Sequence, residues 1–165
     1  MKEYLNKINN NEMLNSEDID KLISDYSGYL NINLDNLSGV ESLIFHQNTL
    51  IDIEQYLIFN HKYTNSIIQH LILSYDAKIK KQFKQFSKFE RIKIAKKLGI
   101  SELYEYVNTL EDYYTIEEIN YDLKQDLNKL STELRLLNNM SLINFDGFNA
   151  YAYEEPKKQK KKTMN

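Results

Sequence analysis

The chain has 165 residues, a formal net charge of −3, no cysteine, four glycines and one proline. Its length is typical of a single domain with its own hydrophobic core, and the absence of cysteine excludes disulfides, thiolate metal sites and cysteine nucleophiles. The scarcity of glycine and proline disfavours an all-β fold and phosphate-binding glycine loops. Because no apolar run has the length of a signal peptide or a membrane span, we expect a cytoplasmic protein that does not enter the membrane.

Apolar residues that recur every three or four positions predict a mainly α fold, a bundle of five to six helices. The predicted helices span residues 2–9, 17–27, 39–59, 64–85, 88–98 together with 102–113, and 116–138. Three helix starts fit the capping box, in which a hydroxyl and a glutamate three residues later satisfy the first backbone amides. These boxes run from Ser38 to Glu41, from Ser87 to Glu90 and from Thr115 to Glu118. Gly99 is expected to end the helix at 88–98 in a left-handed conformation.

The segment 116–138 has the clearest helical pattern of the chain. Its apolar residues are spaced by three or four positions, which predicts one uninterrupted helix with a single apolar stripe. The stripe consists of Ile116, Ile119, Leu123, Leu127, Leu130, Leu134 and Leu137. The predicted core of the whole chain consists of Leu43, Leu50, Leu57, Ile67, Leu71, Ile72, Ile94, Leu98, Ile119, Leu123, Leu127, Leu130 and Leu134.

Residues 142–153 are expected to form a small β-hairpin. Two short runs flank Asp146-Gly147, a dipeptide typical of a type I′ turn. A lone hairpin is only marginally stable in water, so it should pack on the helices. Residues 154–165 contain Pro156 and five lysines and are predicted to be a flexible tail, which leaves 1–153 as a single helical domain.

Charge is distributed very unevenly along the chain. Nine of the 21 basic residues lie between Lys78 and Lys97, where Glu90 is the only acid, and the chain outside this segment and the tail carries −14. Such opposed charges indicate a partner recognised electrostatically, either a nucleic-acid backbone or an acidic protein face, while the acidic remainder could contact a basic protein. We expect the lysines of 78–97 to project together. The candidate binding residues are Lys78, Lys80, Lys81, Lys84, Lys88, Arg91, Lys93, Lys96, Lys97, Tyr151, Tyr153, Lys157 and Lys158.

Aromatic residues accompany both basic segments. Phe83, Phe86 and Phe89 are three residues apart, a spacing that favours packing into the core over stacking on unpaired bases. Tyr151 and Tyr153 alternate with alanines, so both should face the same side of a strand. They either pack on the bundle or form an aromatic pair beside the basic tail.

The sequence contains no strong catalytic or metal-binding motif. His46, His61 and His70 are the only histidines, and none lies at metal-ligand spacing from another or from a nearby carboxylate. A serine-centred glycine elbow is absent, which disfavours triad hydrolysis. Paired carboxylates such as Glu111-Asp112 and Glu117-Glu118 are typical of solvated helix starts, where they interact favourably with the helix dipole. We therefore predict no metal, no cofactor and no catalytic residue.

Two stretches resemble the HEPN family (higher eukaryotes and prokaryotes nucleotide-binding). Residues 89–100, Phe-Glu-Arg-Ile-Lys-Ile-Ala-Lys-Lys-Leu-Gly-Ile, are similar to the stretch that follows its two long helices. Residues 127–135, Leu-Asn-Lys-Leu-Ser-Thr-Glu-Leu-Arg, are similar to the approach to its ribonuclease motif, an arginine followed four to six residues later by histidine. Arg135 matches the arginine, but Leu136 replaces the usual asparagine, Ser141 occupies one of the histidine positions, and no histidine follows His70. The resemblance covers about residues 41–139 and implies a member without the nuclease centre that binds RNA or protein, commonly in defence, toxin–antitoxin or mobile-element systems.

Three functional hypotheses follow from these observations. The leading one is a non-enzymatic binding protein that docks a nucleic acid or nucleoprotein complex through the basic face and the tail, as a phage- or plasmid-encoded regulator or inhibitor would. The second is an RNase of the HEPN kind that uses Arg135 with unconventional partners. The third is a structural subunit that pairs its 116–138 stripe with another chain or a second copy of itself.

Overall fold

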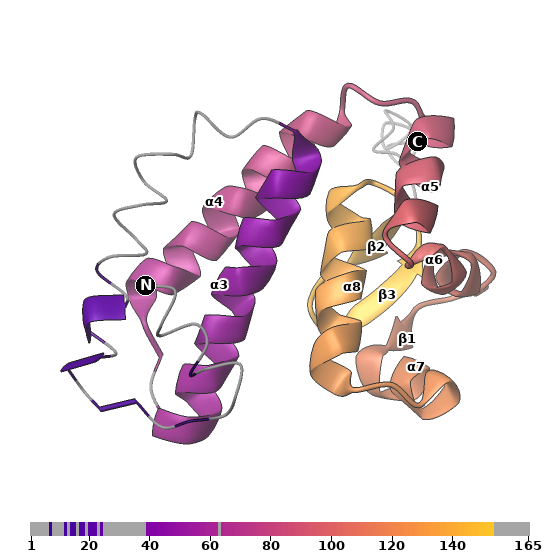
Figure 1. The fold of residues 1–165 in the computed structure, drawn as a ribbon. Helices are drawn as coiled ribbons and strands as arrows, with labels where there is room; N and C mark the ends of the chain where they lie inside the picture. Colours follow the sequence, from indigo (N-terminus) through magenta and orange to yellow (C-terminus); the bar gives the residue numbers. More distant parts are fainter. Residues whose placement is uncertain are drawn as a thin grey trace, which may run out of the picture. The chain divides into compact units, whose positions relative to one another are not determined.

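A computed structural model describes residues 7, 12, 14–15, 17–18, 20–22, 24, 39–62 and 64–153. They belong to two compact units, Met1–Gln82 and Phe83–Asn165, which are treated one at a time. The described elements are mainly helical with a small antiparallel sheet near the C-terminus, which confirms the predicted fold class (Figure 1). Apart from residue 7, the predicted helix at 2–9 lies outside the described residues, as do about half of that at 17–27 and the whole tail. The single-domain organisation stays a prediction. None of the described helices combines the length and the apolar character needed to cross a membrane.

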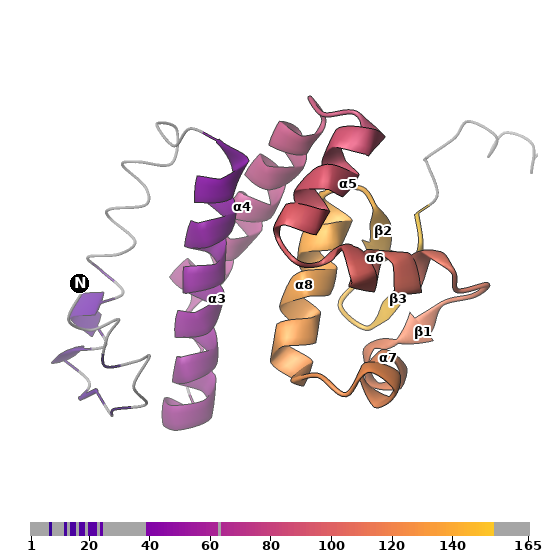
Figure 2. The ribbon, with the colours of Figure 1, turned by 45° about the vertical axis from the view of Figure 1, so that its right-hand side comes forward.

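The first unit contains two long antiparallel helices, α3 (Val40–His61) and α4 (Ser66–Phe83), which lie side by side (Figures 1 and 2). The buried Gln47 amide joins them, because its Nε2 donates to the Ile72 carbonyl (3.1 Å) and to Asp76 Oδ1 (2.6 Å). Leu43, Leu50, Leu57, Leu71 and Ile72 are buried as predicted. The prediction for Ile67 is wrong, because the buried face of α4 starts at Ile68 and a neighbouring helical position points about 100° away from it.

Tyr56 connects α3 to the described N-terminal residues. Its hydroxyl donates to the Glu12 carbonyl (2.8 Å) and accepts from the Leu14 amide (2.9 Å), and Leu14 is buried. At the other end of α3 the N-cap is Gly39, with φ at 80° and no side-chain hydrogen bond. The predicted capping box from Ser38 to Glu41 is therefore wrong, because the helix begins one residue too late for it.

The second unit combines four helices with a three-stranded antiparallel sheet of order β1-β3-β2. Its elements are α5 (Lys88–Lys97), α6 (Ser101–Asn108), β1 (Tyr114–Thr115), α7 (Ile116–Leu123), α8 (Leu127–Asn139), β2 (Ile143–Phe145) and β3 (Asn149–Ala152). In the register, Ala150 of β3 lies between Tyr114 of β1 and Phe145 of β2, and it is fully buried. Helix α8 packs on β2 and α6 on β3. The hairpin is confirmed, whereas β1 was not predicted and the expected helix at 102–113 ends at Asn108.

The predicted continuous helix at 116–138 is wrong, because the chain breaks between α7 and α8. Lys124 ends α7 in the left-handed region (φ 52°), and Asp126 starts α8 by accepting from the Lys129 amide (3.2 Å) through Oδ2. The Asn120 side chain accepts from the Gln125 amide (3.2 Å), so two polar side chains satisfy backbone groups that a continuous helix would pair. Of the predicted stripe, Leu127 at the break is exposed, whereas Leu130, Leu134 and Leu137 are fully buried.

The remaining helix boundaries in this unit follow the sequence signals. Thr115 and Glu118 form the predicted capping box at α7. Gly99 has φ of 78° and ends α5 as predicted, with its amide bonded to the Lys96 carbonyl and the Ile100 amide to the Ala95 carbonyl. Of the predicted core residues, Ile119 is buried, whereas Ile94, Leu98 and Leu123 are half-buried.

The hairpin turn differs from the predicted type I′. That turn needs positive φ at both central residues, but only Gly147 (φ 101°) has it in this segment, and Asp146 does not. Instead, Asp146 Oδ1 accepts from the amides of Phe148 (2.9 Å) and Asn149 (2.7 Å), while the Asp146 amide donates to the Asn149 carbonyl (3.2 Å). Positive φ at Gly147, with Phe148 as the second central residue, is the pattern of a type II′ turn.

Arg91 fastens α5 to the end of α8. Its Nη1 donates to the carbonyls of Met140 (2.8 Å) and Ser141 (3.0 Å). Ser141 takes the left-handed conformation (φ 58°) that usually follows a helix in a Schellman end, and the Leu142 amide bonds to the Leu137 carbonyl. The guanidinium thus satisfies carbonyls at a helix C-terminus, where a positive charge is also favoured by the helix dipole.

Replacing Asp126 by alanine should lower the free energy of unfolding by about 1 kcal/mol, because the first turn of α8 loses its cap. Urea denaturation followed by circular dichroism measures this change. Asp126→Asn keeps the acceptor oxygen and should remain close to the parent. Equal stability of Asp126→Ala and the parent would contradict the break as described.

The carboxylate of Asp146 in the hairpin turn should make the free energy of unfolding depend on pH in the acidic range. Hydrogen bonds from the backbone amides of Asn149 and Phe148 lower the pKa of Asp146 below its usual value. Its stabilising contribution is therefore complete above the unfolded-state pKa and is lost as pH falls through the folded-state pKa. The stability advantage of the parent over Asp146→Asn should be present at about pH 6 and shrink at about pH 3, as measured by urea denaturation. An advantage that grows on acidification would contradict this assignment.

Arg91→Ala should destabilise the chain by about 2 kcal/mol, because two charge-assisted hydrogen bonds to the end of α8 disappear. Arg91→Lys should recover only part of this loss, since an ammonium lacks the planar fork of donors. Lys93→Ala, an exposed neighbour on α5, is the matched control and should change stability by less than about 0.5 kcal/mol. Thermal and urea unfolding measure all three, and equal effects of Arg91→Ala and Lys93→Ala would refute the clamp.

Candidate nucleic-acid interface

The predicted basic residues are distributed over both units. Lys80 and Lys81 are exposed in the last turn of α4, and Lys78, earlier in the same helix, is half-buried and takes part in an interaction. The others lie in the second unit, on α5 or in the turn before it. That all nine basic residues of 78–97 project together from one face therefore stays a prediction. The basic surface considered below is the one on α5.

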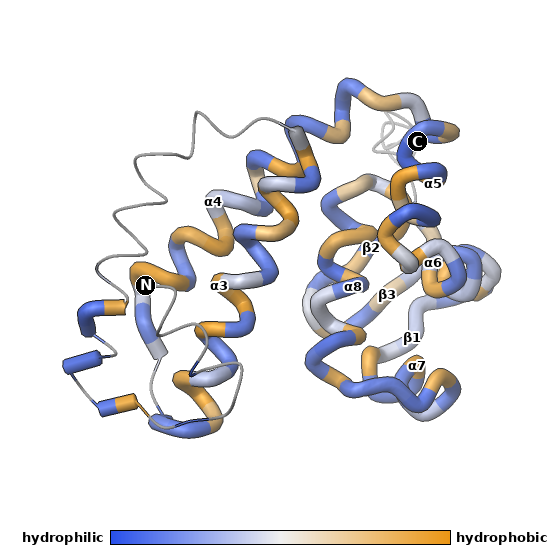
Figure 3. The backbone as a smooth tube through the Cα atoms, in the orientation of Figure 1, coloured by the Kyte–Doolittle hydropathy of each residue, from blue (hydrophilic) through white to orange (hydrophobic). Residues whose placement is uncertain are grey.

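One side of α5 carries four exposed residues, a phenylalanine and three lysines. Phe89, Lys93, Lys96 and Lys97 occupy positions i, i+4, i+7 and i+8, which share a helix face, and all four are exposed. The buried Ala95 lies on another side of the helix, and hydrophobic and hydrophilic positions alternate along α5 (Figure 3). Helix geometry thus sorts this segment into a packed side and a basic, solvent-facing side, which we call the α5 surface.

The only acid of the basic segment is used to start the helix. Glu90 Oε1 accepts from the Ser87 amide (2.9 Å), while the Ser87 hydroxyl accepts from the Glu90 amide (3.2 Å), so the predicted capping box is confirmed. Both hydrogen bonds lower the pKa of Glu90, and the one from the Ser87 backbone amide has the larger effect. Its carboxylate is thus engaged at the N-terminus of α5. Lys84 and Lys88, both exposed, add two more cations around this helix start.

Phe89 is the residue for which sequence periodicity was misleading. Phe83 is buried and contacts the half-buried Phe86 at 5.8 Å between ring centroids, as expected for core packing. Phe89 is 70% exposed, so its predicted burial is wrong. The turn at Lys84–Ser87 separates α4 from α5, and the helical spacing does not continue through it. On α5 the ring lies beside the Lys93 ammonium, whose Nζ is 5.4 Å from the ring centroid.

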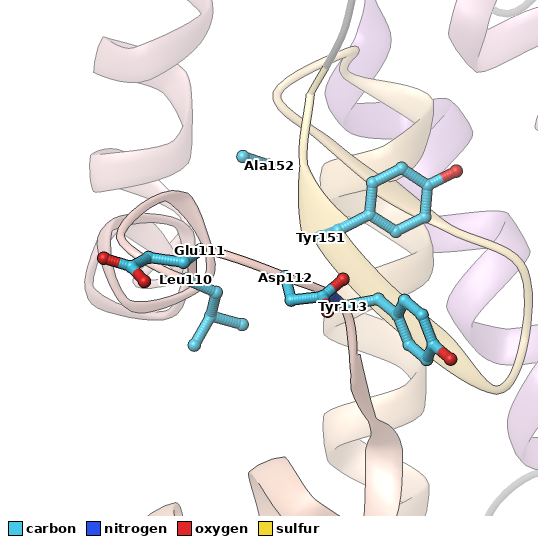
Figure 4. Close-up of a pocket in the computed structure, with 6 residues that line it drawn as sticks. All are labelled: Leu110, Glu111, Asp112, Tyr113, Tyr151 and Ala152. Atoms are coloured by element: carbon cyan, nitrogen blue, oxygen red, sulfur yellow. The ribbon is translucent and has the colours of Figure 1, made fainter.

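The remaining predicted contacts do not lie on the α5 surface. Arg91 is engaged with the end of α8 and is not on the α5 surface. Tyr151 is 37% exposed and lines a pocket of about 280 Å³ together with Glu111 and Asp112, where the carboxylates would repel phosphate (Figure 4). Tyr153 is half-buried, and Lys157 and Lys158 lie outside the described residues.

The pocket beside Tyr151 was missed by sequence reasoning, which assigned Glu111 and Asp112 to a solvated helix start. The available signal was the charge of the surrounding segment. Between residues 102 and 126 there are eight acids and a single lysine, Lys124, an imbalance nearly as large as that of the basic segment.

The remaining titratable candidates do not form a reactive cluster. Burial lowers the pKa of His46, whose ring stacks with that of Tyr75. No three histidine, aspartate or glutamate side chains come together as a metal site within the described part of the chain. Arg135 is half-buried in α8 and takes part in an interaction, so the HEPN resemblance and its ribonuclease reading stay predictions.

Comparison with known proteins gave no match to any family model, to any curated protein or to any solved structure.

Proposed function

We propose that this chain binds single-stranded nucleic acid through the α5 surface and does so without catalysis. The exposure of Phe89 among lysines is the observation that carries the proposal. Phe148 is equally exposed, so exposure alone does not distinguish Phe89; its ring is distinguished by the Lys93 ammonium, whose Nζ is 5.4 Å from the ring centroid. A ring flanked by cations is the arrangement that single-strand binders use to stack a base while neighbouring charges contact phosphates.

Electrostatics supports the same conclusion. Lys84, Lys88, Lys93 and Lys96 are exposed, and Glu90 is the only acid among the nine basic residues of 78–97. Each lysine that neutralises a phosphate releases condensed counterions, which gives affinity and makes it salt-dependent. The Arg91 clamp holds α5 in place, so the surface is presented with a fixed orientation. A regulator or inhibitor that docks on a nucleoprotein complex would use this surface in the same way.

Charge reversal tests the electrostatic part. Binding of a labelled single-stranded RNA of about 12 nucleotides would be measured by fluorescence anisotropy over a range of salt concentrations. The double variant Lys93→Glu with Lys96→Glu should bind at least tenfold more weakly, and its dependence of log K on log salt should flatten by about 1.4, or 0.7 for each phosphate contact. Lys124→Glu with Lys129→Glu is the matched control elsewhere in this unit and should have a small effect. Loss of binding in the control to the same degree would overturn the assignment to α5.

The stacking part needs a separate variant. Phe89→Ala should weaken single-stranded RNA binding by about 1–3 kcal/mol without changing the salt dependence, and it should leave weak duplex DNA binding unaltered. Phe148→Ala, in the exposed β2–β3 turn, is the matched control. Lys80→Glu with Lys81→Glu tests the other unit. If only this α4 pair mattered, or if Phe89→Ala bound normally, the proposed site would be wrong.

A further inference from the structure

The second unit has another charged surface, opposite in sign to the α5 surface. Between residues 102 and 126 every acidic side chain is exposed, and none forms an ion pair with a described residue. These are Glu102, Glu105, Glu111, Asp112, Glu117, Glu118, Asp122 and Asp126. The only basic residue among them is Lys124. Ordinary solvated surfaces mix both signs of charge, so this segment has the electrostatic character of a cation-binding face.

Exposed aromatic rings accompany these carboxylates. Tyr113 is 58% exposed and Tyr151 is 37% exposed, and Tyr121 on α7 is also exposed. Tyrosine is enriched at protein interfaces, since it offers a rigid amphipathic ring at a low cost in conformational entropy. Its face also attracts ammonium and guanidinium groups. Carboxylates together with tyrosine rings are thus the chemistry that recognises lysine and arginine.

The sheet register brings the two tyrosines together. Tyr114 pairs with Ala150 in antiparallel register, so the preceding Tyr113 comes opposite Tyr151. Both rings project toward the same side of β3, with the Asp112 carboxylate near Tyr113 (Figure 4). The side chains of Glu111 and Ala152 lie toward the other side. The pocket of about 280 Å³ is lined by Leu110, Glu111, Asp112, Tyr113, Tyr151 and Ala152.

We propose that the pocket residues of this segment, Glu111, Asp112 and Tyr113 together with Tyr151, dock a lysine- or arginine-rich segment of a partner polypeptide. The acids of α6 and Tyr121 lie outside the pocket and contribute only to the general field. Charge complementarity selects this occupant, because the same field that attracts a cationic peptide repels nucleic acid. The pocket is smaller than the roughly 300–1,000 Å³ of small-molecule sites, a size suited to one long side chain of a peptide that continues over the surface. None of the residues involved belongs to the α5 surface, so this proposal stands or falls independently of nucleic-acid binding.

Neutralising the pocket carboxylates is the first test. A fluorescein-labelled oligoarginine peptide would be titrated with the full-length chain at near-physiological ionic strength. Glu111→Gln with Asp112→Asn should bind about tenfold more weakly, since two ion pairs are removed. Glu102→Gln with Glu105→Gln removes the same charge from α6 and should change affinity by less than about twofold. Equal weakening by both pairs would show a diffuse acidic field and would overturn the proposed site.

The aromatic contribution has its own variants. Tyr113→Ala with Tyr151→Ala should weaken peptide binding about fivefold, whereas Tyr113→Phe with Tyr151→Phe keeps the ring faces and should bind like the parent. Circular dichroism verifies folding of each variant. Tyr121→Ala is the control for an exposed tyrosine outside the pocket, and a loss equal to that of the alanine pair would contradict the proposal.

A last variant separates an external partner from the lysines of the chain itself. The full-length chain with glutamine at positions 157, 158, 160, 161 and 162 should bind the peptide as the parent does, or up to a few fold tighter. Tight binding by this variant together with no measurable binding by the parent would show that the tail occupies the surface, and the proposed external partner would be rejected.

Discussion

The hydrogen bonds from the Arg91 guanidinium to the carbonyls of Met140 and Ser141 determine which face of α5 is exposed to solvent in the second unit. They connect the middle of α5 to a helix end that lies about fifty residues further along the chain, where unpaired carbonyls would otherwise need water. Because these hydrogen bonds fix the rotation of α5 about its axis, the opposite face of the helix, with Phe89, Lys93 and Lys96, remains exposed to solvent. A residue that the sequence suggested as a phosphate contact thus acts instead as the support of the surface on which such contacts would form.

Local capping has a similar double effect at the start of α5. The box between Ser87 and Glu90 begins a new helix after only four intervening residues, and this interruption removes Phe89 from the register of Phe83 and Phe86. It also engages the one carboxylate of the segment. A single local motif therefore exposes the aromatic ring and holds the one negative charge of the segment, which stays ionised, at the N-terminus of α5.

Sequence patterns predicted much of this fold where hydrophobic burial and local hydrogen bonds agree. The paired helices α3 and α4, the caps of α5 and α7, and the hairpin all follow from such signals. Prediction failed where polar side chains compete with a regular apolar spacing, as Asp126 and Asn120 do within the 116–138 stripe. The short strand β1 has only two residues and depends on pairing with β3, so no local pattern could reveal it. The Tyr113–Tyr151 pair depends on the same long-range register, whereas the charge imbalance around it was visible in the sequence.

The separation of charge within the second unit has a consequence for the way it approaches other molecules. Exposed lysines gather on α5, and exposed carboxylates lie on the adjacent α6 and on α7, which is at the other end of the unit (Figure 1). Such an arrangement gives the unit a permanent electric dipole moment, which turns it during diffusion before any contact is made. In the field of a polyanion α5 would lead, and in the field of a polycation the acidic side would lead. The same protein could thus meet two partners of opposite charge in two different orientations, and added salt would weaken this selection by orientation for both.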